Sequence, residues 1–91
     1  MTTLTTLKII TTAQDRLCYS LTESVHEDGR ISYGVKVTTT LFGSSETAAV
    51  EDISSERQIV EKFLELLADN LVLPSTLEEI AEDYVASIFT V

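Results

Sequence analysis

The sequence has few of the residues from which proteins build redox, metal or phosphate sites. It contains one cysteine, Cys18, one histidine, His26, and three glycines. A single cysteine cannot form an internal disulfide, and this usage is typical of a reducing, cytoplasmic compartment. Gly29, Gly34 and Gly43 are too far apart for a glycine-rich loop that cradles phosphate. We therefore expect a cytoplasmic protein with no cofactor-binding loop.

Positive charge is also scarce, and it is distributed unevenly. Residues 1–45 carry four Lys or Arg against four Asp or Glu, whereas residues 46–91 carry two against eleven. The resulting net charge of −9 repels nucleic acid phosphates and anionic lipid. The sequence therefore predicts neither a nucleic acid nor a membrane partner, whereas a basic protein surface or a divalent cation would be better tolerated; of these we favour a protein partner.

Long apolar stretches are absent as well. No uninterrupted stretch approaches the roughly 18 residues that a membrane-spanning helix needs, and residues 1–12 lack the pattern of a signal peptide. The hydrophobic fraction of 44% and the length of 91 residues suit one globular domain. We expect a single domain over residues 1–91, in which residues 1–13 form either an extra strand or a frayed tail.

The first half of the chain carries the alternation of strands that bury one face. Residues 17–25 and 31–41 have mostly apolar side chains at odd positions, and a third strand is predicted over residues 47–53. A three-residue loop ending in a left-handed Gly29 keeps one face apolar throughout the first hairpin, because it sets Val25 opposite Ile31.

The second half carries two amphipathic helical patterns, over residues 59–67 and 77–89. Ser55 and Ser75 each begin a capping-box pattern and are the predicted helix N-caps. Asn70 is the predicted left-handed terminator of the first helix. The expected fold is α+β: a two-layer sandwich in which an antiparallel three- or four-stranded β-meander precedes a helical hairpin packed on one face.

Four short strings and Pro74 carry a resemblance. The strings are YGVKV at residues 33–37, VEDIS at 50–54, LLADN at 66–70 and EIAEDY at 79–84. Over roughly residues 17–86 the sequence resembles a family of small uncharacterised proteins from Firmicutes, chiefly clostridia. The resemblance implies a bacterial cytoplasmic protein of unknown function and transfers no site residue.

His26 and Cys18 lack the neighbours that catalysis or metal binding requires. His26 lies at the mouth of the hairpin, far along the strand from Cys18, and we interpret it as a solvated turn residue. Cys18 is on the polar face of its strand with Arg16 as its nearest cation, and we interpret it as an unreactive thiol. No metal site is predicted for the carboxylates of the second helix either, since they form an ordinary solvated face: Glu78, Glu79, Glu82 and Asp83.

Glu23 is the exception on the apolar face. It lies between Leu21 and Val25, and the preferred register sets it opposite Tyr33. A buried carboxylate shifts its pKa or finds a partner, which can mark a site, although exposure at the end of the strand explains it equally well. Glu23 and Tyr33 are therefore the candidate functional positions.

The sequence leaves three functions open. We favour a small acidic, non-enzymatic interaction or regulatory module, with no catalytic, cofactor-binding or metal-binding residue. One alternative is a small-ligand-binding protein or enzyme accessory subunit with a pocket near Glu23, Tyr19 and Tyr33. The other is a structural homodimer paired through a strand edge, for which residues 38–40 are the candidate.

Overall fold

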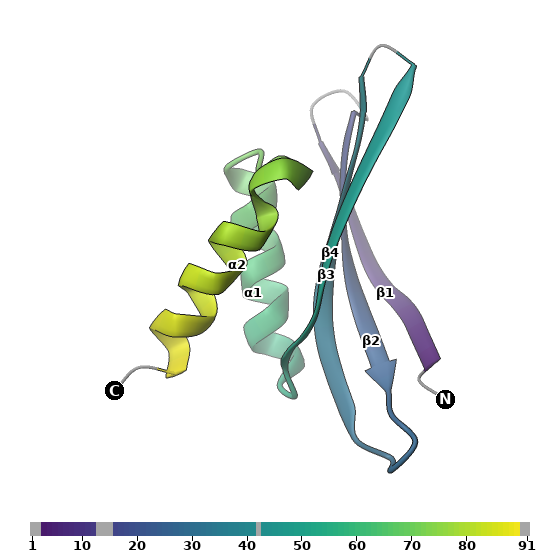
Figure 1. The fold of residues 1–91 in the computed structure, drawn as a ribbon, viewed down its shortest axis with the longest axis vertical. Helices are drawn as coiled ribbons and strands as arrows, with labels where there is room; N and C mark the ends of the chain where they lie inside the picture. Colours follow the sequence, from purple (N-terminus) through teal and green to yellow (C-terminus); the bar gives the residue numbers. More distant parts are fainter. Residues whose placement is uncertain (1–2, 13–15, 42, 90–91) are drawn as a thin grey trace.

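Four strands come first along the chain and two helices follow. The computed structural model describes residues 3–12, 16–41 and 43–89. The elements are β1 (Thr3–Thr12), β2 (Leu17–Val25), β3 (Ile31–Leu41), β4 (Ser44–Ser54), α1 (Arg57–Asp69) and α2 (Pro74–Phe89). The strands form one antiparallel sheet in the order β1-β2-β3-β4, and both helices cover the same face of it (Figure 1). The predicted two-layer α+β fold is confirmed, with β1 as its fourth strand; residues 1, 2 and 13 of the N-terminal segment lie outside the described part.

The β2–β3 hairpin has the predicted register. Val25 pairs with Ile31, and Gly29 has a φ of 85°. The loop is closed by the His26 amide, which donates to the Arg30 carbonyl at 2.8 Å. This register decides the layer structure, because it directs the odd-numbered apolar side chains of both strands toward the helices.

The core lies between the sheet and the helices. Its fully buried side chains come from β2, β3 and both helices: Tyr19, Leu21, Val35, Val37, Val60, Phe63, Leu64, Leu67 and Leu77. Tyr19 also donates a hydrogen bond from its hydroxyl to the Val72 carbonyl at 2.9 Å, which ties the connection between the helices to the sheet. The side chains of Ile88 and Phe89, which continue the apolar pattern of α2, lie outside the described part.

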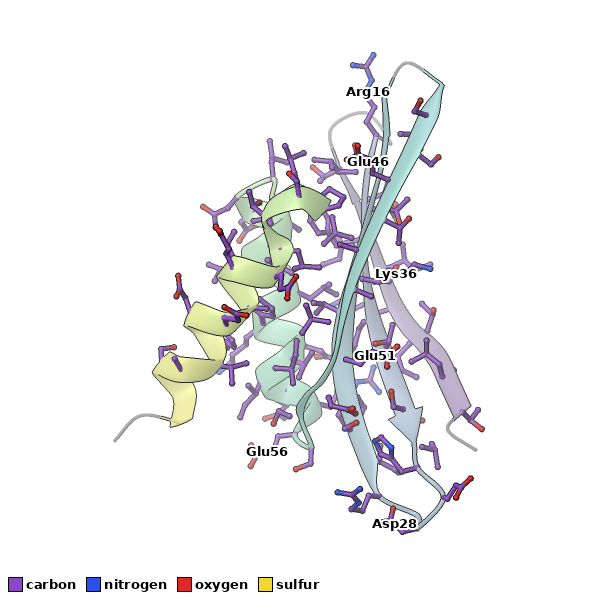
Figure 2. The ribbon with its side chains drawn as sticks, viewed as in Figure 1. Arg16, Asp28, Lys36, Glu46, Glu51 and Glu56 are labelled. Carbon is purple, nitrogen blue, oxygen red and sulfur yellow. The ribbon has the colours of Figure 1, made fainter. Side chains whose placement is uncertain are left out.

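The free edges of the sheet are β1 and β4. β3 is an inner strand, so residues 38–40 cannot provide the strand edge that the sequence suggested for a homodimer. Thr38 pairs with both Cys18 and Thr47, and Thr39 pairs with both Leu17 and Glu46. The face of the sheet opposite the helices, here called the open face, carries Lys36, which points away from the helical layer (Figure 2).

Both predicted N-caps are wrong. α1 begins at Arg57 after an extended Glu56, which makes no side-chain cap; the Ser54 hydroxyl accepts the Glu56 amide instead, at 3.0 Å. α2 begins at Pro74, so Ser75 lies inside the helix. Proline suits the first helical position because it has no amide hydrogen to leave unpaired.

The end of α1 also differs from the prediction. Asn70 has a φ of −99°, and Leu71 is the left-handed residue, with a φ of 50°. The Val72 amide donates to the Leu67 carbonyl at 3.0 Å and the Leu71 amide donates to the Ala68 carbonyl at 3.2 Å. This is a Schellman arrangement, which places the left-handed residue one position later than expected. No helix in the described residues is long and apolar enough to cross a membrane.

Candidate functional site

A groove with a volume of about 650 Å³ runs between the edge strand β4 and helix α2. Its larger apolar residues are Val50 and Ile53 from β4 and Val85 from α2, and three alanines also line it. Four carboxylates stand along it: Glu51, Asp52, Glu78 and Glu82. None of its lining residues is Lys or Arg. The β4–α2 groove therefore combines an apolar floor with a negatively charged rim.

An irregularity in β4 shapes this groove. Val50 and Ser54 pair with β3, whereas Glu51–Ile53 between them have no partner residue there. The backbone of β4 approaches Gly34 closely at this point. A Cβ on Gly34 would overlap the Val50 carbonyl oxygen and lie 2.8 Å from the Cα of Glu51. Glycine is therefore required at this position for the bulge to form where it does.

Asp52 lies at the centre of the bulge, with a φ of 56°. Aspartate adopts this left-handed conformation more readily than most residues. The Ser32 hydroxyl donates to Asp52 Oδ1, and His26 Nε2 lies 3.1 Å from the same oxygen and 3.0 Å from Ser32 Oγ. These contacts, called the Asp52 network, tie the bulge to the β2–β3 hairpin.

The network changes the acidity of its carboxyl group. The hydrogen bond from Ser32 lowers the pKa of Asp52 most, and the charges of His26 and Arg30 lower it further, whereas burial acts in the opposite direction. Asp52 is therefore held in its charged form, which adds to the negative charge along the groove. His26, interpreted from the sequence as a solvated turn residue, lies next to the hairpin loop with a side chain that is 23% exposed and contacts both other members of the network.

The Asp52 network does not have the geometry of a nucleophile triad. A triad needs the carboxylate on one imidazole nitrogen and the hydroxyl on the other. Here Ser32 and Asp52 both contact Nε2 of His26, and the serine proton points to the carboxylate. The arrangement therefore positions Asp52 and does not activate Ser32.

Comparison with known proteins identifies the family. A family model described as a family of unknown function (DUF6514) matches residues 1–87. The chain belongs to this family. No curated protein and no solved structure is significantly similar to the chain. Membership of DUF6514 brings no activity with it, so the function of this chain has to be argued from its own surface.

Glu23 and Tyr33, the candidate positions from the sequence, do face one another across β2 and β3. Both side chains are half-buried, and Tyr33 packs against the core. The three hollows described in this DUF6514 chain are lined by other residues, and Tyr19 is buried with its hydroxyl bound to Val72. A functional role for Glu23 and Tyr33 remains a prediction.

The other candidates are distributed over the surface. Cys18 is half-buried beside Ser20 Oγ, 4.0 Å away. The residues of the described ranges contain no group of three or more potential metal ligands from His, Cys, Asp and Glu. The acidic face of α2 is divided: Glu78 and Glu82 line the groove, whereas Glu79 and Asp83 do not.

Two further hollows accompany the groove in the DUF6514 fold. One, of about 620 Å³, is lined by members of the Asp52 network together with Arg30, Ser54 and Ser55. The other, of about 460 Å³, lies at the turn between the helices. Three leucines around that turn are 46%, 49% and 44% exposed: Leu66, Leu71 and Leu73. The left-handed residues Asp52 and Leu71 thus each line a hollow.

Sequence reasoning missed the groove because its two walls come from separate segments. A signal was present within α2, where Ala81 and Val85 repeat with the same spacing as Glu78 and Glu82. That pattern describes a helix face that is both apolar and acidic, a combination suited to binding. The matching wall in β4 could not be read from the alternation, because the bulge interrupts it.

Proposed function

We propose that this protein is a non-enzymatic interaction module that binds a basic segment of a partner protein in the β4–α2 groove. The observation that carries the proposal is the composition of the groove: an apolar floor, four carboxylates and no Lys or Arg among its lining residues. Such a surface fits a segment in which basic and apolar side chains occur together.

The two kinds of contact play different parts in binding. Burial of apolar side chains against Val50, Ile53 and Val85 supplies most of the affinity. The carboxylates attract the partner and exclude acidic or neutral competitors. The wider surface acts in the same direction, because α2 carries four carboxylates and no Lys or Arg. The same charge disfavours nucleic acid and anionic membranes as partners.

We further propose a cytoplasmic location, supported by the lone Cys18, and a bacterial origin, supported by the resemblance to clostridial proteins. A homodimer remains an alternative, now through the free edges β1 and β4.

Fluorescence anisotropy with a defined probe tests the proposal. The probe is fluorescein-labelled acetyl-Lys-Val-Lys-Val-Lys-Val-Lys-amide, and the same peptide with Glu in place of Lys is the negative probe. We expect saturable binding of the basic peptide alone. The double variant Glu78→Gln/Glu82→Gln should weaken it about five- to tenfold at low ionic strength, since exposed charge pairs contribute up to about 1 kcal/mol each.

The matched control is Glu79→Gln/Asp83→Asn, which removes the same charge from the same helix outside the groove. It should weaken binding less than about twofold, because only long-range attraction is lost. Equal weakening by both double variants would mean that the peptide follows net charge and not the groove. In that case the proposed function would be wrong.

A further inference from the structure

We infer that the basic segment binds as an extended strand added to the free edge of β4, and not as a helix laid in the groove. This inference rests on the proposed function and specifies the conformation of the bound segment. The partner would thus be a flexible or edge-exposed segment whose basic and apolar residues alternate.

The position of the groove carries the inference. β4 is the last strand of the sheet and has no neighbouring strand on its outer side. In such an edge strand, the N–H and C=O groups of every second residue point outward, here away from β3. The groove is lined by the unbroken series Ala49–Ile53. Ala49 and Val50 pair with adjacent β3 residues and therefore point to opposite faces of the sheet. A hollow that both of them line must extend along the backbone edge between the two faces.

Strand addition also explains why α2 forms the second wall. In an added strand, alternate side chains would point to the helical side of the sheet. There they would meet Val50 together with Ala81 and Val85 of α2, which are apolar. The intervening side chains would point to the side of Ala49, with Glu51 nearby. Lysines would take the helical side, where their aliphatic stems cover these apolar residues and their ammonium groups reach Glu78 and Glu82. Valines would take the side of Ala49, whose partner in β3 is Lys36.

The regular part of β4 limits where pairing can occur. Its pairing with β3 is uninterrupted from Ser44 to Val50, and the bulge at Glu51–Ile53 ends it. The added strand would therefore pair alongside the last residues of this regular part. Its continuation would lie beside the bulge, where Asp52 is held in its charged form by the Ser32 hydroxyl.

Charge distinguishes a basic partner from a second copy of β4. This strand carries three carboxylates, Glu46, Glu51 and Asp52, and no Lys or Arg. Pairing two copies of β4 would bring these charges together, which is unfavourable across strands. A basic strand removes that repulsion and supplies opposite charges in its place.

Two isomers of the basic probe test the conformation. One is N-methylated on the backbone at its three valines and the other at its last three lysines. Since the N–H groups of alternate residues point to opposite edges of a strand, only one isomer can present unblocked N–H groups to β4 in a given orientation. We expect the two affinities to differ by at least about tenfold, because several backbone hydrogen bonds are lost in one isomer only.

Amide hydrogen exchange in the ¹⁵N-labelled protein provides the second measurement. With the unmethylated peptide bound, the outward-facing amides within Glu46–Val50 should exchange at least about tenfold more slowly. Exchange in α2 should be unchanged. Protection confined to α2 would show that the segment lies on the helix, which would overturn the inference.

The outcomes separate the two proposals. Equal binding by both N-methylated isomers, with the effect of Glu78→Gln/Glu82→Gln retained, would overturn strand addition and leave the groove as the binding site. Binding insensitive to Glu78→Gln/Glu82→Gln would overturn the proposed function as well. Slow exchange in β4 without peptide, accompanied by self-association in analytical ultracentrifugation, would identify a second copy as the occupant and overturn the assignment of a basic partner.

Discussion

The rings of Phe63 in α1 and Tyr84 in α2 stack, with centroids 4.4 Å apart and an angle of 15° between their planes. Phe63 is fully buried, whereas Tyr84 is half-buried and packs against the core from its rim. This contact joins the two helices over the sheet. α2 also packs directly on β4, so the groove between them rests on both contacts.

We expect Phe63→Ala to lower the free energy of unfolding by about 3–5 kcal/mol, because it removes a buried ring and leaves a cavity. A protein of this size has roughly 5–9 kcal/mol in total, so the variant should be marginally folded at body temperature. Urea unfolding followed by circular dichroism measures the change. Glu82→Ala on the exposed side of α2 is the control and should change stability by less than about 0.5 kcal/mol. A cooperative Phe63→Ala variant as stable as wild type would contradict the core assignment.

Tyr19→Phe should cost about 1–2 kcal/mol, since it leaves the buried Val72 carbonyl without its donor at 2.9 Å. Tyr84→Phe is the matched comparison. Its hydroxyl makes a longer, 3.4 Å contact with the Ile59 carbonyl at a partly exposed position, so its removal should cost less than about 0.5 kcal/mol. Denaturant midpoints of the two variants measure the difference. Equal losses would indicate that the hydrogen bond of Tyr19 does not hold the helix connection.

Gly34→Ala should destabilise the protein by about 2 kcal/mol or more, because the added methyl group overlaps the backbone of β4. NMR shift changes should concentrate in Val50–Ser54, where the bulge has to move. Ser45→Ala, on the exposed part of the same strand, should have little effect. A Gly34→Ala variant with wild-type stability and unchanged shifts would show that the two strands do not approach so closely.

Stability should depend on pH through Asp52. Its pKa in the folded protein is lowered from the ordinary value of 3.8, chiefly by the Ser32 hydroxyl. A lowered pKa contributes stability above the unfolded value, and this contribution is lost as the pH falls through the folded value. Asp52→Asn keeps a residue that tolerates the left-handed backbone. Wild type should thus be the more stable protein near neutral pH. The difference in free energy of unfolding between wild type and Asp52→Asn should disappear below about pH 4.

A double-mutant cycle with Ser32→Ala supplies the control for that experiment. Without the serine hydroxyl, Asp52→Asn should change stability less, and the acid dependence of the two proteins should be more alike. If the stability difference between wild type and Asp52→Asn were the same at pH 7 and in acid, the substitution would act through the backbone and not through the charge.

Substitutions at the ends of the helices give a further prediction. Leu71→Gly should stabilise the protein by up to about 1 kcal/mol, because glycine adopts a φ of 50° without the steric cost that leucine has. Ser75→Ala should be neutral or slightly stabilising, since Ser75 lies inside α2 and alanine favours helix. Thermal unfolding measures both. A loss of about 1 kcal/mol on Ser75→Ala would restore the serine as the N-cap.

The sequence by itself determined the layers and the pairing of the hairpin. Alternating side chains in residues 17–25 and 31–41 allow one register that keeps an apolar face, and Gly29 supplies the turn that this register needs. The helical patterns likewise predicted the buried face of each helix, because a periodicity of 3.6 residues is a local property, although Leu66 within the first pattern is 46% exposed. The helix caps were not determined in this way. Ser75 matched the capping-box pattern, but α2 begins one residue earlier, at Pro74.

Only the tertiary structure decided where the groove lies. Gly34 and the bulge at Glu51–Ile53 belong to different strands, and their contact exists only once β3 and β4 have paired. The same pairing brings His26 and Ser32 to Asp52 across sequence separations that no local pattern records. The groove then requires α2 beside an edge strand, which follows from strand order and helix packing. Strand alternation and helix periodicity act over a few residues, whereas a binding surface is formed by segments that meet only in the folded chain.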